Sequence, residues 1–130
     1  MKTANNSYVD SYDLSKIRST PFPNRLLETA VTLPQTQARI ILVIVRWTLG
    51  WKAGSRTERK ASVSLTYREL LRLVGLRSPG VVGNAVAALV DGGIIDVLSD
   101  DGQLLVTSSQ RRRYPGTLRF RISKRFVEHG

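Results

Sequence analysis

The pattern of apolar and polar positions over residues 64–95 predicts two short helices joined by a tight turn. The first helix begins at Thr66, which forms a capping-box pattern with Glu69 three residues later. Apolar residues then recur at helical spacing until Gly75, which can adopt a positive φ and so ends the helix. A second helix is therefore expected to follow after only a few residues.

The second helix is expected to begin at Ser78-Pro79, a capping residue followed by proline at the first helical position. Two glycines, Gly92 and Gly93, are expected to stop it, and strand-like sequence follows at once. This order is typical of a helix-turn-helix that continues into a wing. The apolar stripe of the second helix is formed by Val82, Ala85, Val86 and Leu89.

Residues 1–20 are polar without a sustained period, which indicates a flexible N-terminal arm that Tyr8 and Tyr12 attach to the body.

Two helices are also predicted upstream of residue 64. A short helix is predicted over residues 24–31, with Asn24 as its cap.

A longer helix is predicted from the capping-box pattern Thr32-Leu33-Pro34-Gln35 to about Leu49. Because residues 40–47 are apolar nearly all round, we expect this helix at the centre of the core. Trp47 and Trp51 are expected to be buried with it. The alternative is that one face of the helix packs against a second subunit.

The remaining apolar runs predict a small antiparallel sheet. The turn Ser99-Asp100-Asp101-Gly102 lies between two apolar runs, which is a strong hairpin signal. In the last strand Phe120 and either Leu118 or Ile122 are expected to be buried, while Arg119 and Arg121 face outward. The predicted strands cover residues 61–64, 94–98, 104–107 and 117–123, with basic loops at 52–60 and 108–116.

Together these elements predict an α+β fold, a winged helix-turn-helix with three to four helices and a small antiparallel sheet. The chain is divided into a flexible arm (1–20), a winged-helix DNA-binding domain (21–123) and a C-terminal tail (124–130). A length of 130 residues suits one domain with its own core.

The positive net charge of the chain favours nucleic acid as the ligand of this predicted fold. The chain carries 20 Lys and Arg against 10 Asp and Glu, and the positive excess lies mainly in the N-terminal half and in residues 111–130. A hydrophobic content of 42% excludes a disordered polycation. The alternative is a basic surface that serves solubility alone.

Residues at three places are predicted to contact DNA. Asn84 is the one good base reader of the second helix, because its amide can pair with adenine. The helix is otherwise rich in Gly and Ala, so packing of this face against another protein stays open as an alternative. The candidate contacts are Arg77, Ser78, Gly80, Gly83 and Asn84 at the second helix, Arg111, Arg112 and Arg113 at the tip of the wing loop, and Arg56, Arg59 and Lys60 in the loop before the first strand.

Catalytic and metal chemistry find little support. The one histidine, His129, lies next to the C-terminus, and no hydrolase, P-loop or metalloprotease motif is present. The absence of cysteine excludes disulfides and thiolate metal sites. We therefore expect neither an enzyme nor a cofactor. The longest apolar run, residues 40–45, is far shorter than the roughly 20 residues of a membrane span, so a cytoplasmic, nucleoid-associated protein without a signal peptide is expected.

Several of these motifs stand in the order seen in one family of phage proteins. Over roughly residues 20–123 the chain resembles the N-terminal domain of phage replication protein O and its relatives. The resemblance is carried by Pro23-Asn24-Arg25-Leu26-Leu27-Glu28, by Leu49-Gly50-Trp51 at the end of the long helix, and by residues 64–95, including Val82, Ala85, Val86, Leu89, Gly93, Ile94 and Ile95.

The resemblance implies a winged-helix domain that binds repeated sites at a replication origin. In that family a separate C-terminal part recruits the host helicase machinery. Such a part is missing from these 130 residues, so the chain is expected to be either a fragment of a longer initiator or a small stand-alone relative.

We therefore expect sequence-specific binding of double-stranded DNA at a phage or plasmid replication origin. Two alternatives stay open: a winged-helix transcriptional repressor, and a replisome interaction module with weak DNA binding. The expected partner is double-stranded DNA, with a replicative helicase or its loader and a second copy of the chain as further candidates. No membrane partner is expected.

Overall fold

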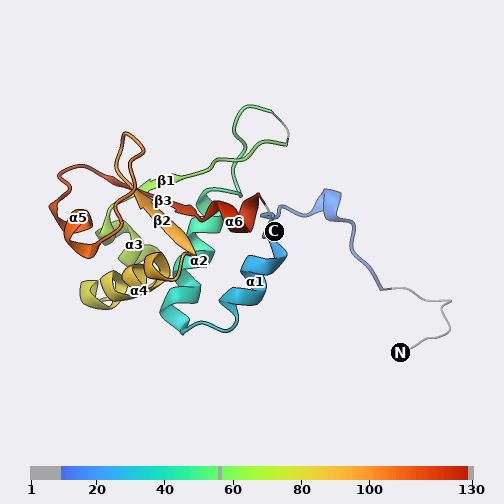
Figure 1. Ribbon diagram of the computed structural model, residues 1–130. Helices are drawn as coiled ribbons and strands as arrows, with labels where there is room; N and C mark the ends of the chain where they lie inside the picture. The colour runs from blue at the N-terminus through green and yellow to red at the C-terminus, as the bar shows by residue number, and fades with distance from the viewer. Residues whose placement is uncertain (1–9, 56, 129–130) are drawn as a thin grey trace.

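The computed structural model describes residues 10–55 and 57–128 (Figure 1). Within these ranges the chain forms an α+β fold in which helices pack against a small antiparallel sheet. The predicted α+β class is confirmed, and the order of its elements is compatible with a winged helix-turn-helix. The elements are η1 (Leu14–Lys16), α1 (Asn24–Ala30), α2 (Gln35–Trp47), β1 (Val63–Leu65), α3 (Tyr67–Leu73), α4 (Pro79–Asp91), β2 (Ile95–Leu98), α5 (Ser108–Arg113), β3 (Leu118–Ile122) and α6 (Lys124–Val127).

Helix α2 lies at the centre of the core. It packs against α1, α3, α4 and β3, which places it between the other helices and the sheet. Its side chains Ile40, Ile41, Ile44 and Val45 are buried, as the apolar pattern predicts. Leu42 remains exposed on the outer side of the helix.

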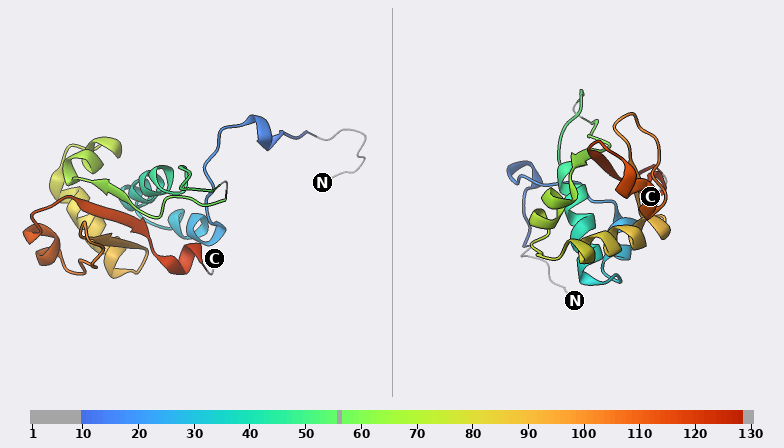
Figure 2. Two further views of the ribbon diagram at one scale, coloured as in Figure 1. Left: turned by 90° about the horizontal axis from the view of Figure 1, so that it is seen from above. Right: turned by 90° about the vertical axis from the view of Figure 1, so that its left-hand side faces the viewer.

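The N-terminal segment runs away from this body (Figures 1 and 2). Its residues 10–19 are exposed, and Tyr12 is among them, so the prediction that Tyr12 tacks the arm onto the body is wrong. Tyr8 lies outside the described residues.

Neither upstream helix begins with the predicted side-chain cap. Helix α1 has Pro23 at its N-cap, and Asn24 is its first helical residue. The Thr32 hydroxyl donates to the carbonyl of Thr29 at 2.7 Å, so it serves the end of α1 instead of the start of α2. Pro34 stands at the N-cap of α2 and, like any proline, offers no side-chain acceptor.

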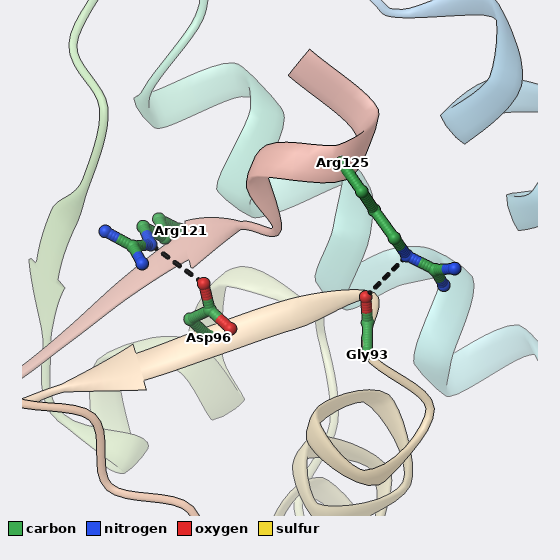
Figure 3. A network of polar contacts seen from close by, with 4 residues as sticks. All are labelled: Gly93, Asp96, Arg121 and Arg125. Carbon is green, nitrogen blue, oxygen red and sulfur yellow. Dashed lines mark hydrogen bonds and ion pairs between the residues drawn. The ribbon is translucent and has the colours of Figure 1, made fainter. Parts of the chain in front are cut away.

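The sheet has the order β1-β3-β2, with antiparallel pairing on both sides of β3. Phe120, at the centre of β3, lies opposite Val63 of β1 and Val97 of β2 and is completely buried. On the outer face Arg121 donates to the Asp96 carboxylate across the β2–β3 pair at 2.9 Å (Figure 3). Strand β3 also packs against α2, so it joins the sheet to the helical layer.

Part of the predicted hairpin is absent from the described residues. Residues 104–107 do not form a strand, and only Leu104 makes an isolated bridge, to Leu98. The predicted loop 108–116 contains α5, and α6 follows β3. The prediction of three to four helices is therefore wrong, because the described residues hold six α-helices.

Helix α6 belongs to the body, although its residues were assigned to a tail. Phe126 is only 3% exposed and joins the hydrophobic core. The Arg125 guanidinium donates to the carbonyls of Gly93 at 3.0 Å and of Gly92 at 3.2 Å, and Gly92 is the C-cap of α4 (Figure 3). A cation at the carbonyl end of a helix is favourable, so α6 both covers the core and fixes the end of α4.

The docking of α6 predicts unequal effects for two neighbouring residues. Phe126→Ala should lower the free energy of unfolding by about 3–5 kcal/mol, because it leaves a cavity in the core. Val127→Ala should lower it by less than about 1 kcal/mol, since Val127 is 43% exposed. Urea denaturation of both variants measures the difference, and two equally small effects would show that α6 is a tail.

Candidate nucleic-acid interface

The α3–turn–α4 unit begins with the predicted capping box. The Thr66 hydroxyl accepts from the Glu69 N–H at 3.0 Å, and the Glu69 carboxylate accepts from the Thr66 N–H at 2.9 Å. These hydrogen bonds favour the charged carboxylate and hold the pKa of Glu69 below its ordinary value. The start of α3 is thus determined by residues three positions apart.

The turn between the helices also follows the sequence signals. Gly75 has a φ of 75°, the left-handed conformation that ends α3. Ser78 caps α4 by accepting from the Val81 N–H at 3.4 Å, and Pro79 is the first helical residue. Arg39 of α2 donates to the carbonyl of Val74 at 3.3 Å and so ties the turn to the central helix.

Helix α4 has one buried and one exposed face. The buried face is the predicted one, with Val82, Ala85, Val86 and Leu89. The exposed face bears Gly80, Val81, Asn84 and Ala88, so Asn84 is its polar side chain over the first two turns.

Tyr67, the first residue of α3, joins this unit to the core. Its ring lies 6.2 Å from that of Phe120, and a Cβ added to Gly83 would lie 3.9 Å from it. Burial raises the pKa of Tyr67, while the charge of Arg111 opposes the rise. Tyr67 is not among the residues predicted for the site, although its helical spacing of three residues to Leu70 marks it as facing inward.

The arginine triplet lies on a helix, and its prediction as the tip of a loop is wrong. Helix α5 opens with a capping box, in which the Thr107 hydroxyl accepts from the Gln110 N–H at 3.1 Å. The Gln110 side-chain oxygen accepts in return from the Thr107 N–H at 3.0 Å.

The three arginines of α5 differ in their burial and in what their side chains contact. Arg111 is 5% exposed and donates to the carbonyls of Leu105 at 3.1 Å and Val106 at 3.0 Å, and to the Ser108 hydroxyl at 3.1 Å. Its guanidinium therefore holds the segment before α5 in place. Arg112 and Arg113 are exposed and are available to a ligand.

Helices α4 and α5 lie at the same end of the molecule (Figure 1) and enclose a hollow of ≈ 350 Å³. A second hollow of ≈ 420 Å³ adjoins it, and both are lined by Tyr67, Arg111 and Arg112. The structure thus brings together residues predicted from two separate segments. The lining of the first hollow is Tyr67, Pro79, Gly80, Gly83, Asn84, Ser108, Arg111 and Arg112.

Tyr114 fixes the far end of α5 to the turn after β2. Its hydroxyl accepts from the Asp100 N–H at 2.9 Å and donates to the Asp100 carboxylate. The bond to the carboxylate raises the pKa of Tyr114 because it favours the protonated phenol. Together with Arg111, this contact keeps α5 beside α4.

The third predicted segment lies elsewhere. Lys52 and Arg59 form an isolated antiparallel bridge, so residues 51–53 and 58–60 run side by side after α2. In Figure 1 this segment lies at the opposite side of the sheet from α4 and α5. Arg59 is half-buried and Lys60 is exposed there, while Arg56 lies outside the described residues.

Two further searches cover the same described ranges. They contain no group of three or more His, Asp or Glu side chains close enough to hold a metal ion. None of their helices has both the length and the apolar character that crossing a bilayer requires.

Comparison with known proteins adds no relative: no family model, curated protein or solved structure matches the chain. We therefore infer the function from the geometry and charge of the surface around the hollow between α4 and α5, which we call the α4–α5 surface.

The two roles of the arginine triplet predict unequal effects on stability. Arg111→Ala should lower the free energy of unfolding by about 1–3 kcal/mol, because the carbonyls of Leu105 and Val106 before α5 lose their hydrogen-bond donor. Arg112→Ala should change it by less than about 0.5 kcal/mol, as for other exposed positions. Urea denaturation tests the pair, and equal losses would contradict the assignment of Arg111 to the scaffold.

The capping box of α3 predicts a pH-dependent contribution to stability. The pKa of Glu69 is lowered in the folded state, so its contribution is present above the unfolded value and is lost as pH falls through the folded value. Glu69→Gln should therefore be less stable than the parent at about pH 7, and the difference should shrink as pH falls through the folded pKa of Glu69. Denaturation midpoints at several pH values measure this, and a difference that persists in acid would rule out the charge as its source.

Proposed function

We propose that the chain is a winged-helix protein that binds double-stranded DNA at a replication origin. The order α2-β1-α3-α4-β2-β3, with β3 between its two partners, suits a winged helix-turn-helix in which α4 is the recognition helix. Helix α5 stands in the connection between β2 and β3, where a wing would be.

One observation carries the proposal: Arg112 of α5 and Asn84 of α4 line the same hollow at one end of the molecule. A helix inserted into the major groove presents its N-terminal half to base edges, and there Asn84 can make two hydrogen bonds to adenine. The absence of a side chain at Gly80 lets the backbone of α4 approach the DNA closely. Arg112 would then reach the phosphates beside the groove.

The charges at this surface set the expected salt dependence. Arg77, Arg112 and Arg113 are exposed around α4 and α5, whereas Arg111 is occupied by carbonyls of its own chain. Three phosphate contacts correspond to a slope of log K against log salt of about −3. Phosphate contacts would therefore supply much of the affinity, and Asn84 most of the discrimination among bases.

The origin as target follows from the resemblance of residues 20–123 to the N-terminal domain of phage replication protein O. A transcriptional repressor would use the same surface on a different site, because fold alone does not determine function. The identity of the bound sequence distinguishes these two roles.

A second candidate is a protein-interaction module of the replisome. It is favoured by the exposed Val81 beside Gly80 and Ala88 on α4, a small apolar face without charge. Such a face suits close packing against a helicase or its loader. Under this candidate DNA binding would be weak and unselective.

Binding to DNA tests the proposal directly. Labelled duplexes tiled across the origin of the replicon that encodes the chain, and shuffled versions, are titrated by fluorescence anisotropy at about 50–200 mM salt. We expect a preference above about a hundredfold for one tile. Asn84→Ala should reduce this preference about tenfold, since a bidentate base contact contributes discrimination of that order.

Charge variants provide the second arm of this experiment. Arg112→Ala/Arg113→Ala should weaken binding to all duplexes and reduce the salt slope by about 2, at most one unit for each phosphate contact. Lys16→Ala is a control for the removal of a positive charge, because Lys16 is exposed in η1 and the N-terminal segment runs away from the body (Figure 1). Equal affinity for all duplexes would contradict the proposed recognition of an origin and would favour the protein-interaction module.

A further inference from the structure

The two tryptophans of the chain stack on each other at the surface. Trp47, the last residue of α2, and Trp51 have ring centroids 5.7 Å apart and an interplanar angle of 14°. Their exposed fractions are 36% and 45%, so the prediction that both are buried in the core is wrong. Large aromatic surface left in water beyond a single residue is a common mark of a binding site.

A cation accompanies this aromatic pair. The guanidinium carbon of Arg46 lies 5.2 Å from the ring centroid of Trp47 and 5.8 Å from that of Trp51. Both distances are within the range of cation–π attraction. We call Arg46, Trp47 and Trp51 the tryptophan platform.

The backbone holds the platform in shape without a ligand. Thr48 is buried, and its hydroxyl donates to the carbonyl of Ile44 at 2.7 Å, which closes the end of α2. The Trp51 N–H then donates to the carbonyl of Thr48 at 3.0 Å. Gly50 stands between them because a Cβ there would collide with the carbonyl oxygen of Arg46. Little ordering would be needed on binding, which favours affinity.

Positive charge adjoins the platform on one side. The Lys60 backbone N–H donates to the carbonyl of Trp51 at 3.0 Å, and the Lys52 backbone pairs with that of Arg59. Lys52 and Lys60 are therefore backbone neighbours of Trp51, and both are exposed. Glu58 is the acidic residue of this segment. A ligand that fits must therefore combine flat aromatic groups with repeated negative charge.

We infer that the tryptophan platform, together with Lys52 and Lys60, forms a site for single-stranded DNA, separate from the duplex surface at α4 and α5. Unpaired bases expose faces that stack on indoles, whereas the bases of a duplex are stacked on one another. The phosphates would follow Lys52 and Lys60. This inference goes beyond the proposed function and does not depend on it, because the two surfaces share no residue.

Tryptophan fluorescence reads this site alone, since the chain has no tryptophan elsewhere. Oligo(dT) of about 15 nucleotides, long enough for a typical single-strand site, is titrated into the full chain at about 50 mM salt. We expect saturable quenching. A sugar-phosphate oligomer of the same length without bases should bind at least about tenfold more weakly, because stacking of even one base contributes that much.

A matched pair of variants tests the stacking itself, with anisotropy of labelled oligo(dT) as the readout. Trp51→Phe keeps an aromatic face and should bind within about threefold of the parent, whereas Trp51→Leu keeps only apolar bulk and should lose about tenfold or more. Both replacement side chains are apolar and smaller than tryptophan, and thermal melting of the two variants checks that they are folded. Duplex binding by both should equal that of the parent.

Three outcomes would overturn the inference. They are no binding of oligo(dT), binding without quenching that Trp51→Leu leaves unchanged, and equal quenching by poly-glutamate, which would identify an acidic protein as the partner. Arg112→Ala/Arg113→Ala should leave oligo(dT) binding unchanged. A failure of duplex recognition and a failure of the platform are therefore observed independently.

Discussion

The packing of Phe120 between the sheet and the helices is the contact on which the rest of the structure depends. Its strand pairs on both sides, so this one position joins β1 and β2, and its ring meets Tyr67 at the start of α3. Tyr67 in turn lines both hollows at the end of the molecule where α4 and α5 meet. The aromatic contact from β3 to α3 therefore joins the candidate interface to the sheet, while the buried face of α4 joins it to α2.

Arginine serves two purposes in this protein, and the distinction lies in what the guanidinium meets. Arg39, Arg111 and Arg125 donate to backbone carbonyls that helix ends and turns leave without partners. A planar guanidinium with several donors suits that task better than the single ammonium of lysine. Arg112 and Arg113 make no such contact among the described residues and remain free for a polyanion. The net charge alone thus overstates the charge that is available for binding.

Local signals predicted the caps of α3 and α4 correctly but not those of α1 and α2, and features that depend on distant residues were not predicted. The capping box at Thr66, the positive φ at Gly75 and the cap at Ser78 each depend on residues a few positions apart, and all are confirmed. The same local signal, Thr107 with Gln110, marks α5, but the arginine run after it favoured a loop. The exposure of the tryptophan platform depends on what the rest of the chain leaves uncovered, and no local pattern contains that information. Whether the α4–α5 surface binds DNA stays a prediction.

The topology of the sheet has a consequence for how the chain folds during synthesis. Strand β3 is the middle strand, yet it is the last to be made, after residues 63–65 and 95–98. Until it emerges, β1 and β2 have no partner, and the apolar side of α2 that contacts β3 stays uncovered. The helical unit from α2 to α4 can form early from local contacts, whereas the sheet must close over long sequence separations, a slow step that exposes unpaired strand edges. Completion of the core therefore has to wait until β3 has been synthesised.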